Sequence, residues 1–107
     1  MNKLLAVTTT IGSLEEAQKL ASTLVGQKLV ACAQISAIES FYHWEDAVQH
    51  DKEFRVVLKT TDACYPALEA AIRALHPYEL PAIFAVALEH VYAPYGDWVE
   101  ANCCPPT

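Results

Sequence analysis

The sequence offers one histidine whose setting suggests metal chemistry. His76 opens the connector His76-Pro77-Tyr78-Glu79-Leu80-Pro81. A neutral imidazole is a good ligand for copper(II) and zinc, so His76 is a candidate metal ligand. The alternative is that His76 caps the carboxyl end of a preceding helix, where a protonated ring interacts well with the helix dipole. The residues alone favour the capping interpretation.

A second set of side chains has the composition of a small-molecule cleft. Such clefts combine aromatic walls with a few polar groups. The candidates are Glu53, Lys59, Tyr78, Glu79 and Trp98. The alternative is that the aromatic members hold subunits together, since tyrosine and tryptophan are enriched at interfaces. The cleft interpretation stays open for Glu53, Lys59 and Tyr78.

The remaining histidines and cysteines point less clearly to chemistry. His43 and His50 flank a predicted turn and could chelate a surface metal with Asp46 or Asp51, but solvated turn residues are the favoured interpretation. The cysteines are Cys32, Cys64, Cys103 and Cys104, and they lack the paired spacing of a zinc site.

The expected redox state of these thiols depends on the cellular compartment of the protein. The chain shows neither a signal peptide nor a membrane span, so we expect a cytoplasmic protein with reduced cysteines. Cys103 and Cys104 precede Pro105 and Pro106, and we expect all four to belong to an unstructured end. The pair of adjacent thiols could also bind a soft metal ion.

A long hairpin over residues 29–60 must position most of these candidates. Its first arm, 29–44, is rich in β-branched, aromatic and small residues, and its return arm is 53–60, with a turn at 45–47. The arms are long against the radius of gyration of about 13 Å expected for such a domain, so the tip should overhang the core.

The overhanging tip carries apolar side chains, which would be exposed in a single copy. These are Ile38, Phe41, Tyr42 and Trp44. An exposed strand edge with apolar side chains invites pairing with another chain, so we expect an obligate oligomer that uses these four residues as its interface.

Helices and strands complete a single α+β domain over residues 1–107. We expect a strand at 3–11, a helix at 13–25 with a capping box at Ser13 and Glu16, and a helix at 61–75 with Asp62 as its N-cap. The apolar helical stripes we expect to be buried are Leu14, Ala17, Ala21, Leu24 and Val25 in the first helix, and Leu68, Ala71, Ile72 and Leu75 in the second.

The end of the chain supplies the last strand and a short helix. We expect a buried strand at 82–88 and a final helix at 97–101. For residues 89–92 two alternatives stay open, an extension of that strand and a short edge strand. Gly26 is the expected stop of the first helix. The order β-α-β-β-α-β predicts a ferredoxin-like fold with both helices on one face of an antiparallel sheet and the other face uncovered.

Composition limits the classes of partner. The 107-residue chain has 7 basic against 13 acidic residues and a formal net charge of −6, which argues against nucleic acid or an anionic membrane as the main partner. Acidity is compatible with attraction for cations. The sequence contains no nucleophile elbow, phosphate loop or zinc-protease motif, so we expect no enzyme.

In their order and spacing, several short segments resemble the CutA divalent-cation tolerance family. They are Lys28–Cys32, Tyr42–Glu45, Glu53 with Leu58–Thr60, His76–Pro81, and Tyr95 with Trp98. The resemblance covers nearly the whole chain. It implies a ferredoxin-like homotrimer joined by long hairpins, with an architecture similar to the PII signalling proteins, and binding of copper(II) (Cu²⁺) or other divalent cations.

The resemblance also implies where copper would bind. One bacterial branch has a cysteine in the first strand and two consecutive histidines before the Pro-Tyr pair. Here the strand position holds Thr9 or its neighbour, the first histidine is Leu75, and only His76 remains. We expect a trimeric copper-binding protein of metal-ion tolerance. The alternative is a PII-like adaptor that binds a small ligand between subunits and engages an unknown protein partner.

Overall fold

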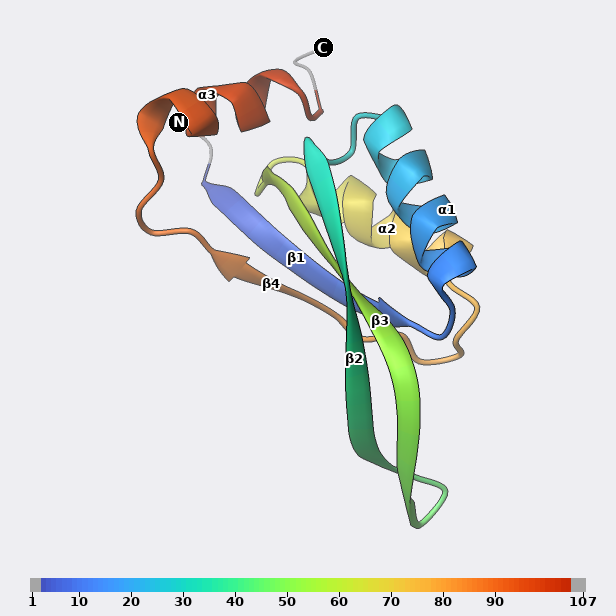
Figure 1. Ribbon diagram of the computed structural model, residues 1–107. Helices are drawn as coiled ribbons and strands as arrows, with labels where there is room; N and C mark the ends of the chain where they lie inside the picture. The colour runs from blue at the N-terminus through green and yellow to red at the C-terminus, as the bar shows by residue number, and fades with distance from the viewer. Residues whose placement is uncertain (1–2, 105–107) are drawn as a thin grey trace.

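The computed structural model describes residues 3–104, in which one antiparallel sheet carries helices on one face (Figure 1). The strands are β1 (Leu4–Ile11), β2 (Cys32–Trp44), β3 (Ala47–Thr61) and β4 (Ile83–Ala87). The helices are α1 (Leu14–Gly26), α2 (Tyr65–Leu75) and α3 (Ala93–Ala101). Pro105 and Pro106 of the expected unstructured end lie outside the described residues.

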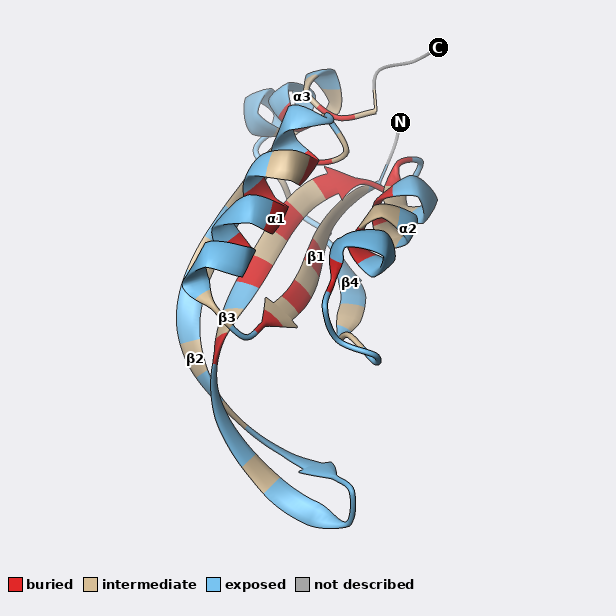
Figure 2. Ribbon diagram, turned by 90° about the vertical axis from the view of Figure 1, so that its right-hand side faces the viewer, coloured by how far each residue is buried: buried red, intermediate tan, exposed pale blue. Residues whose placement is uncertain are grey.

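The predicted topology is confirmed. The strand order is β2-β3-β1-β4, and each neighbouring pair is antiparallel. Together with the order β-α-β-β-α-β, this is the ferredoxin-like arrangement. Figure 2 shows α1 and α2 side by side over the same face of the sheet.

The core lies between this face and the two helices. In β1 the side chains of Val7, Thr9 and Ile11 are buried, because alternate residues of a strand point to the same face. From α1 the buried residues are Ala17, Leu20, Ala21 and Leu24, and from α2 they are Leu68 and Ile72. About 25 cal/mol per Å² of buried apolar surface makes this layer the main source of stability.

For three residues of the predicted helical stripes, the prediction of burial was wrong. Leu14, Val25 and Leu75 are exposed, and Leu20, which we did not predict, is buried. Val25 follows the buried Leu24 and is turned about 100° away from it around the helix. Leu14 and Leu75 stand at helix ends, where fewer side chains of the sheet and of the other helix surround them.

The helix ends follow local hydrogen bonds. The predicted cap of α1 is confirmed, since the Glu16 amide donates to Ser13 Oγ at 3.1 Å. The predicted stop is confirmed, since α1 ends at Gly26 with Gln27 as its C-cap, but the chain first turns left-handed at Lys28, with φ 58°. The N-cap of α2 is Cys64 and not Asp62, because the Cys64 amide donates back to the Thr61 carbonyl at 3.1 Å and forms a turn there.

The hairpin overhangs the rest of the chain, as predicted (Figures 1 and 2). β2 and β3 pair from Cys32 opposite Lys59 to Trp44 opposite Ala47, and the molecule is 44 Å in its longest dimension. The two turn residues, Glu45 and Asp46, have φ of 51° and 61°, the left-handed conformation that suits a tight hairpin turn. The return arm begins at Ala47 and so is longer than predicted.

The last strand differs from the expectation of a buried strand. β4 lies at the edge of the sheet, and its Phe84 and Val86 side chains are exposed on the face away from α1 and α2. The segment 89–92 forms no strand. The final helix begins earlier than predicted, at Ala93, because Pro94 fits the first turn of a helix, where its missing N–H costs no hydrogen bond.

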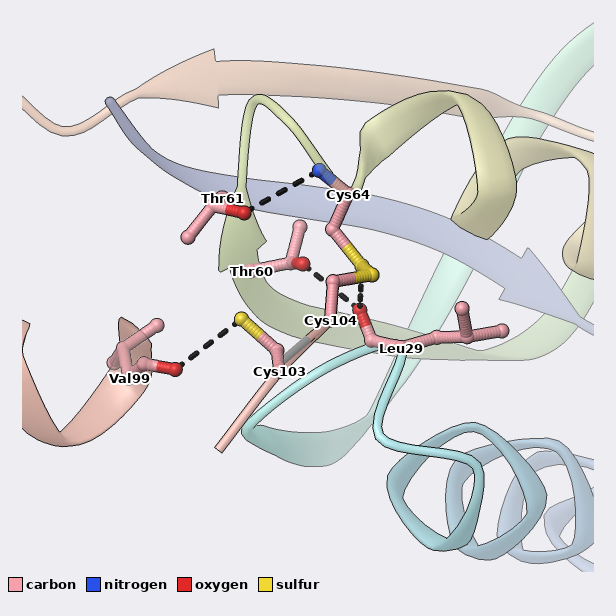
Figure 3. The surroundings of a disulfide bond; sticks show 7 residues. All are labelled: Leu29, Thr60, Thr61, Cys64, Val99, Cys103 and Cys104. Atoms are coloured by element: carbon pink, nitrogen blue, oxygen red, sulfur yellow. Dashed lines mark hydrogen bonds between the residues drawn. A yellow bond between two sulfur atoms is a disulfide. The ribbon is translucent and has the colours of Figure 1, made fainter. Parts of the chain in front are cut away.

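The cysteines overturn two expectations. Cys64 and Cys104 form a disulfide, with their Cα atoms 5.6 Å apart, so these two are not reduced thiols (Figure 3). Cys103 is buried, so neither Cys103 nor Cys104 belongs to an unstructured end. Helix α3 returns the chain to the start of α2, and no local spacing in the sequence indicates that contact.

The membrane expectation concerns helices only. Over residues 3–104, none of the helices has both the length and the apolar character that crossing a membrane requires.

Candidate ligand groove at the base of the hairpin

A groove of about 770 Å³ lies where the hairpin leaves the sheet. The end of β1, both hairpin strands and the connector after α2 contribute to its wall. Its lining includes three carboxylates, Glu39, Glu53 and Glu79. The aromatic lining residues are Phe41, Tyr42, Trp44 and Tyr78. This combination of apolar walls and a few polar groups is typical of small-ligand sites.

The central polar contact of the groove joins Glu53 to Tyr78. The Tyr78 hydroxyl donates to Glu53 Oε2 at 2.7 Å, and Glu53 is only 7% exposed. Burial, together with the hydrogen bond to Glu53 and its negative charge, raises the pKa of Tyr78 well above its usual value. The hydroxyl therefore stays protonated and satisfies a carboxylate that has left water.

Gly12 makes room for this contact. A Cβ atom built at Gly12 would lie 3.2 Å from the Tyr78 hydroxyl, closer than an ordinary carbon–oxygen contact. The glycine that ends β1 therefore allows the tyrosine to lie against the backbone and reach Glu53.

His76 holds the connector in place beside the groove. Its side chain is buried, its Nδ1 accepts from the Tyr78 amide at 3.1 Å, and its Nε2 lies 2.7 Å from the Thr10 carbonyl oxygen. Because Nδ1 accepts, Nε2 carries the proton and donates to Thr10. Both nitrogens of the neutral ring are thus engaged, and metal binding through His76 requires one of these bonds to break.

The predicted capping role of His76 applies to its backbone and not to its imidazole ring. His76 is the C-cap residue of α2, and its amide donates to the Ile72 carbonyl at 2.8 Å. Its ring reaches β1 instead of the last helical carbonyls. The ring therefore fixes the path of the chain from α2 to Tyr78, which is a positioning role.

The positions implied as copper ligands do not converge. Leu75 is exposed, His76 is buried, and Thr9 faces the helix-covered core, where its hydroxyl has no hydrogen-bond partner among the described residues. Within residues 3–104, histidine, cysteine, aspartate and glutamate side chains form no group of three or more that could hold a metal ion.

Lys59 and Trp98 lie apart from the groove. Lys59 is six residues along β3 from Glu53, about 20 Å at 3.3 Å per residue, and its Nζ donates to Gln34 Oε1 at 2.9 Å. Trp98 stacks with Tyr95 on α3, with ring centroids 5.8 Å apart. The Tyr95 hydroxyl is 3.6 Å from Cys32 Sγ, and Cys32 pairs with Lys59 across the hairpin.

The predicted cleft residues therefore form two groups in one chain. Glu53, Tyr78 and Glu79 line the groove, whereas Lys59 and Trp98 lie near the α3 end of β2. The sequence prediction missed Glu39 and Thr10, which also line the groove. The hairpin register could not have indicated Glu39, since it places Ile38 opposite Glu53 and successive side chains of a strand point to opposite faces.

The predicted interface residues lie along the hairpin toward its tip. Phe41 is 67% exposed, Tyr42 and Trp44 are also exposed, and Ile38 is partly buried. Phe41 stacks on His50 with centroids 4.1 Å apart, and His50 Nε2 lies 3.0 Å from Glu39 Oε1. Tyr42 donates a hydrogen bond to Asp51, which raises the pKa of Tyr42. These contacts are within the ribbon, and the outer faces of the aromatic rings remain uncovered.

Fold and groove define the class of protein: a ferredoxin-like α+β domain with an overhanging hairpin and an acidic, aromatic groove at its base. The family model described as CutA1 divalent ion tolerance protein matches residues 5–102. The chain belongs to this family, which makes it a relative of the CutA divalent-cation tolerance proteins.

Individual relatives match over most of their length. The chain is 35% identical to the divalent-cation tolerance protein CutA of Pyrococcus horikoshii over 96 residues, which are 90% of this chain and 94% of the relative. The crystal structure of the stable protein CutA1 from the psychrotrophic bacterium Shewanella sp. SIB1 is similar with a TM-score of 0.93 and 33% identity, covering 98% of each chain.

A Thermus thermophilus structure gives the same result. The divalent cation tolerance protein Cut A1 of that organism matches with a TM-score of 0.91 and 34% identity, over 94% of this chain and 99% of the other. The family and the fold are therefore established for almost the full length of the described chain.

Proposed function

We propose that this chain forms a homotrimer that binds divalent cations, copper(II) first, and acts in tolerance of metal ions. Membership of the CutA divalent-cation tolerance family supports the role in metal-ion tolerance. The observation that carries the assembly is the overhanging ribbon, on which Phe41, Tyr42 and Trp44 are exposed in a single copy. Burial of these aromatic side chains against other copies provides the driving force for association.

Assembly also accounts for the two separated groups of cleft residues. Lys59 and Trp98 from one copy can complete a cleft with Glu53 and Tyr78 from its neighbour, although about 20 Å separates Lys59 from Glu53 within one strand. The exposed Phe84 and Val86 on the uncovered face of the sheet favour the same conclusion, because an apolar sheet face is stable only when covered. The proposed trimer resembles the PII signalling proteins in using ribbons between subunits.

Copper(II) binding is proposed at His76, the remaining member of the implied ligand set. Imidazole nitrogen suits copper(II), and binding at Nε2 would replace the hydrogen bond to the Thr10 carbonyl. Glu53, Glu79 and Glu39 in the adjoining groove add negative charge that attracts a cation. Other divalent cations are expected to bind more weakly at an imidazole site.

Isothermal titration calorimetry of copper(II) against the wild-type protein and the His76→Ala variant tests the site. His90→Ala, which removes an exposed histidine outside the groove, is the matched control. We expect the control to keep the wild-type affinity and His76→Ala to lose at least about tenfold. Equal affinity in all three proteins would remove His76 from the site.

The alternative is a PII-like adaptor, in which a small ligand in the groove changes how the trimer engages an unknown protein partner. The observation that favours it is the Glu53–Tyr78 contact in the 770 Å³ groove, since a buried carboxylate bound to a hydroxyl is a ready polar anchor. A thermal-shift screen of metabolites against wild type and Glu53→Gln tests this idea. A ligand shift that Glu53→Gln abolishes supports the adaptor, and no shift with any metabolite counts against it.

The proposal describes a binding protein of the cytoplasm rather than an enzyme. Its support is that the sequence contains no nucleophile elbow, phosphate loop or zinc-protease motif. A rice relative is named "Protein CutA 1, chloroplastic", so the compartment is a property to measure for each member. Cell fractionation with an antibody to the chain tests the cytoplasmic assignment.

A further inference from the structure

The disulfide between Cys64 and Cys104 joins two segments that are 40 residues apart in the sequence. Cys64 is the N-cap residue of α2, and Cys104 follows the end of α3. Figure 3 shows that the side chain of the neighbouring Cys103 points the other way, toward Val99. The bond therefore attaches the end of α3 to the start of α2.

The segment after α3 is also held without the disulfide. The Cys104 amide donates to the Lys28 carbonyl at 2.6 Å, and the Asn102 amide donates to the Val99 carbonyl at 3.1 Å. Cys103 is buried with Ala31 and Val99, and its thiol donates to the Val99 carbonyl at 3.2 Å. We expect these contacts to hold Cys104 near Cys64 when no covalent bond joins them.

The surroundings of Cys64 suit the reduced state as well as the oxidised one. Cys64 Sγ lies 3.2 Å from the Leu29 carbonyl oxygen, which also accepts from Thr60 Oγ1 at 2.8 Å. A disulfide sulfur has no hydrogen to donate, whereas a thiol can donate to this carbonyl. After reduction, the buried Cys64 thiol therefore still has a hydrogen-bond acceptor, the Leu29 carbonyl.

The two sulfurs differ in access. Cys64 is 1% exposed, whereas Cys104 is partly exposed. A small thiol or disulfide from solvent therefore reaches Cys104 first. Attack at Cys104 Sγ makes Cys64 the leaving group, and once protonated its thiol can donate to the Leu29 carbonyl.

We propose that Cys64 and Cys104 are a reversible thiol–disulfide pair that reacts with low-molecular-weight thiols and disulfides through Cys104. In the reducing direction, a small thiolate attacks Cys104 Sγ, the bond to Cys64 breaks, and Cys64 leaves as a thiolate that takes up a proton. A second small thiolate then attacks the small-molecule sulfur of the mixed disulfide and releases Cys104. The sum is protein disulfide plus two small thiols giving two protein thiols and one small disulfide.

The oxidising direction runs through the same mixed disulfide. The Cys104 thiolate attacks a small disulfide and releases one small thiol, and the Cys64 thiolate then attacks Cys104 Sγ and releases the second. This order makes Cys104 the site of transient modification and Cys64 the resolving residue. The state of the pair decides whether α3 is attached covalently or only by the contacts listed above.

Glutathione titration of the full chain tests the proposal. The protein is equilibrated at a series of ratios of reduced to oxidised glutathione, quenched with N-ethylmaleimide and mapped by peptide mass spectrometry. We expect the fraction of Cys64–Cys104 disulfide to follow the ratio while the circular dichroism of the fold is unchanged. Cys32→Ser, which removes a thiol outside the pair, should titrate like the wild type.

The two single variants test the order of attack. Cys64→Ser removes the resolving residue and should accumulate glutathione on Cys104, whereas Cys104→Ser should leave the buried Cys64 at least about tenfold less modified. Equal modification of both variants would overturn the assigned order. A protein that shows no Cys64–Cys104 bond at any ratio, or one whose bond opens only in denaturant, would overturn the reversible pair.

Discussion

The helix-covered half of the sheet and the overhanging ribbon share strands β2 and β3 but are stabilised differently. In β3, Val56, Leu58 and Thr60 are buried beneath the helices. Toward the tip of the ribbon, Val48 of β3 is exposed, and Phe41 of β2, which pairs with His50, is 67% exposed. The helix-covered half buries its apolar side chains within one chain, whereas the ribbon leaves its apolar side chains exposed.

This difference indicates which part of the fold is stabilised within a single copy of the chain. The covered half has two helices, a capped start to α1 and a disulfide that attaches α3. The ribbon has backbone pairing and a few polar contacts of its own, and an isolated two-stranded hairpin is at best marginally stable in water. We conclude that burial in the covered half stabilises the fold of the subunit, and we propose that the ribbon mediates association with other copies.

The largest effect is expected in the covered half. Leu68→Ala removes a fully buried side chain of α2 and should lower the free energy of unfolding by about 4 kcal/mol, from lost burial and the cavity left behind. Val48→Ala on the ribbon is the matched truncation of an exposed side chain and should change it by less than about 0.5 kcal/mol. Urea unfolding at one fixed protein concentration measures both, and similar losses would break the comparison.

Reduction of the disulfide is expected to come next. The bond closes a loop with a sequence separation of 40, and such cross-links contribute about 3 to 4 kcal/mol by restricting the unfolded chain. Unfolding in the presence and absence of dithiothreitol, with Cys104→Ser as a variant that cannot form the bond, measures the loss. Cys104→Ser should be insensitive to dithiothreitol, and a wild type equally insensitive would contradict the contribution of the bond.

The junction between the two halves should show a smaller, pH-dependent effect. Tyr78→Phe leaves the buried Glu53 carboxylate without its hydroxyl donor and should cost about 1 to 2 kcal/mol near neutral pH. Burial and the contact with Glu53 raise the pKa of Tyr78 above the unfolded value of 10.0. The unfolded chain thus loses this proton first, so the contribution is complete below pH 10 and falls as pH rises above it.

Unfolding of the two proteins between pH 8 and about pH 11 checks this sign. The stability difference between wild type and Tyr78→Phe should be constant at the lower end and shrink toward the upper end. A difference that grows with pH, or one that is absent at pH 8, would show that the hydroxyl does not stabilise Glu53.

The cap of α1 is expected to give the smallest effect. Ser13→Ala removes the acceptor of the Glu16 amide and should cost about 1 kcal/mol. Ser22→Ala, at an exposed position inside the same helix, is the control and should be neutral or slightly stabilising, because alanine favours helix. Thermal unfolding by circular dichroism distinguishes the two, and equal effects would mean that the cap adds nothing to the covered half.

Local patterns in the sequence were sufficient for the topology and for the ribbon. The cap at Ser13, the stop at Leu75 and the turn at Glu45 and Asp46 depend on neighbouring residues, so propensity and spacing reveal them. The position of β4 at the sheet edge and the contact between Cys64 and Cys104 depend on residues far apart in sequence. Periodicity carries no information about such contacts, and these predictions were wrong.

The site was predicted in part for the same reason. The motif around His76 and Tyr78 placed the connector, and Glu53 lies beside it, as the cleft prediction requires. The distance between Lys59 and Glu53 follows from the strand itself and could have been anticipated. That both nitrogens of His76 are engaged depends on Thr10 in a different strand, which no sequence pattern indicated.

The central claim is that the ribbon requires other copies of the chain, and sedimentation equilibrium tests it most directly. We expect the wild type to sediment at about three times the chain mass of 11.8 kDa down to submicromolar concentration. The double variant Phe41→Ser with Trp44→Ser should dissociate to smaller species with its circular dichroism retained. A wild type that sediments as a single, folded chain of 11.8 kDa would contradict the account.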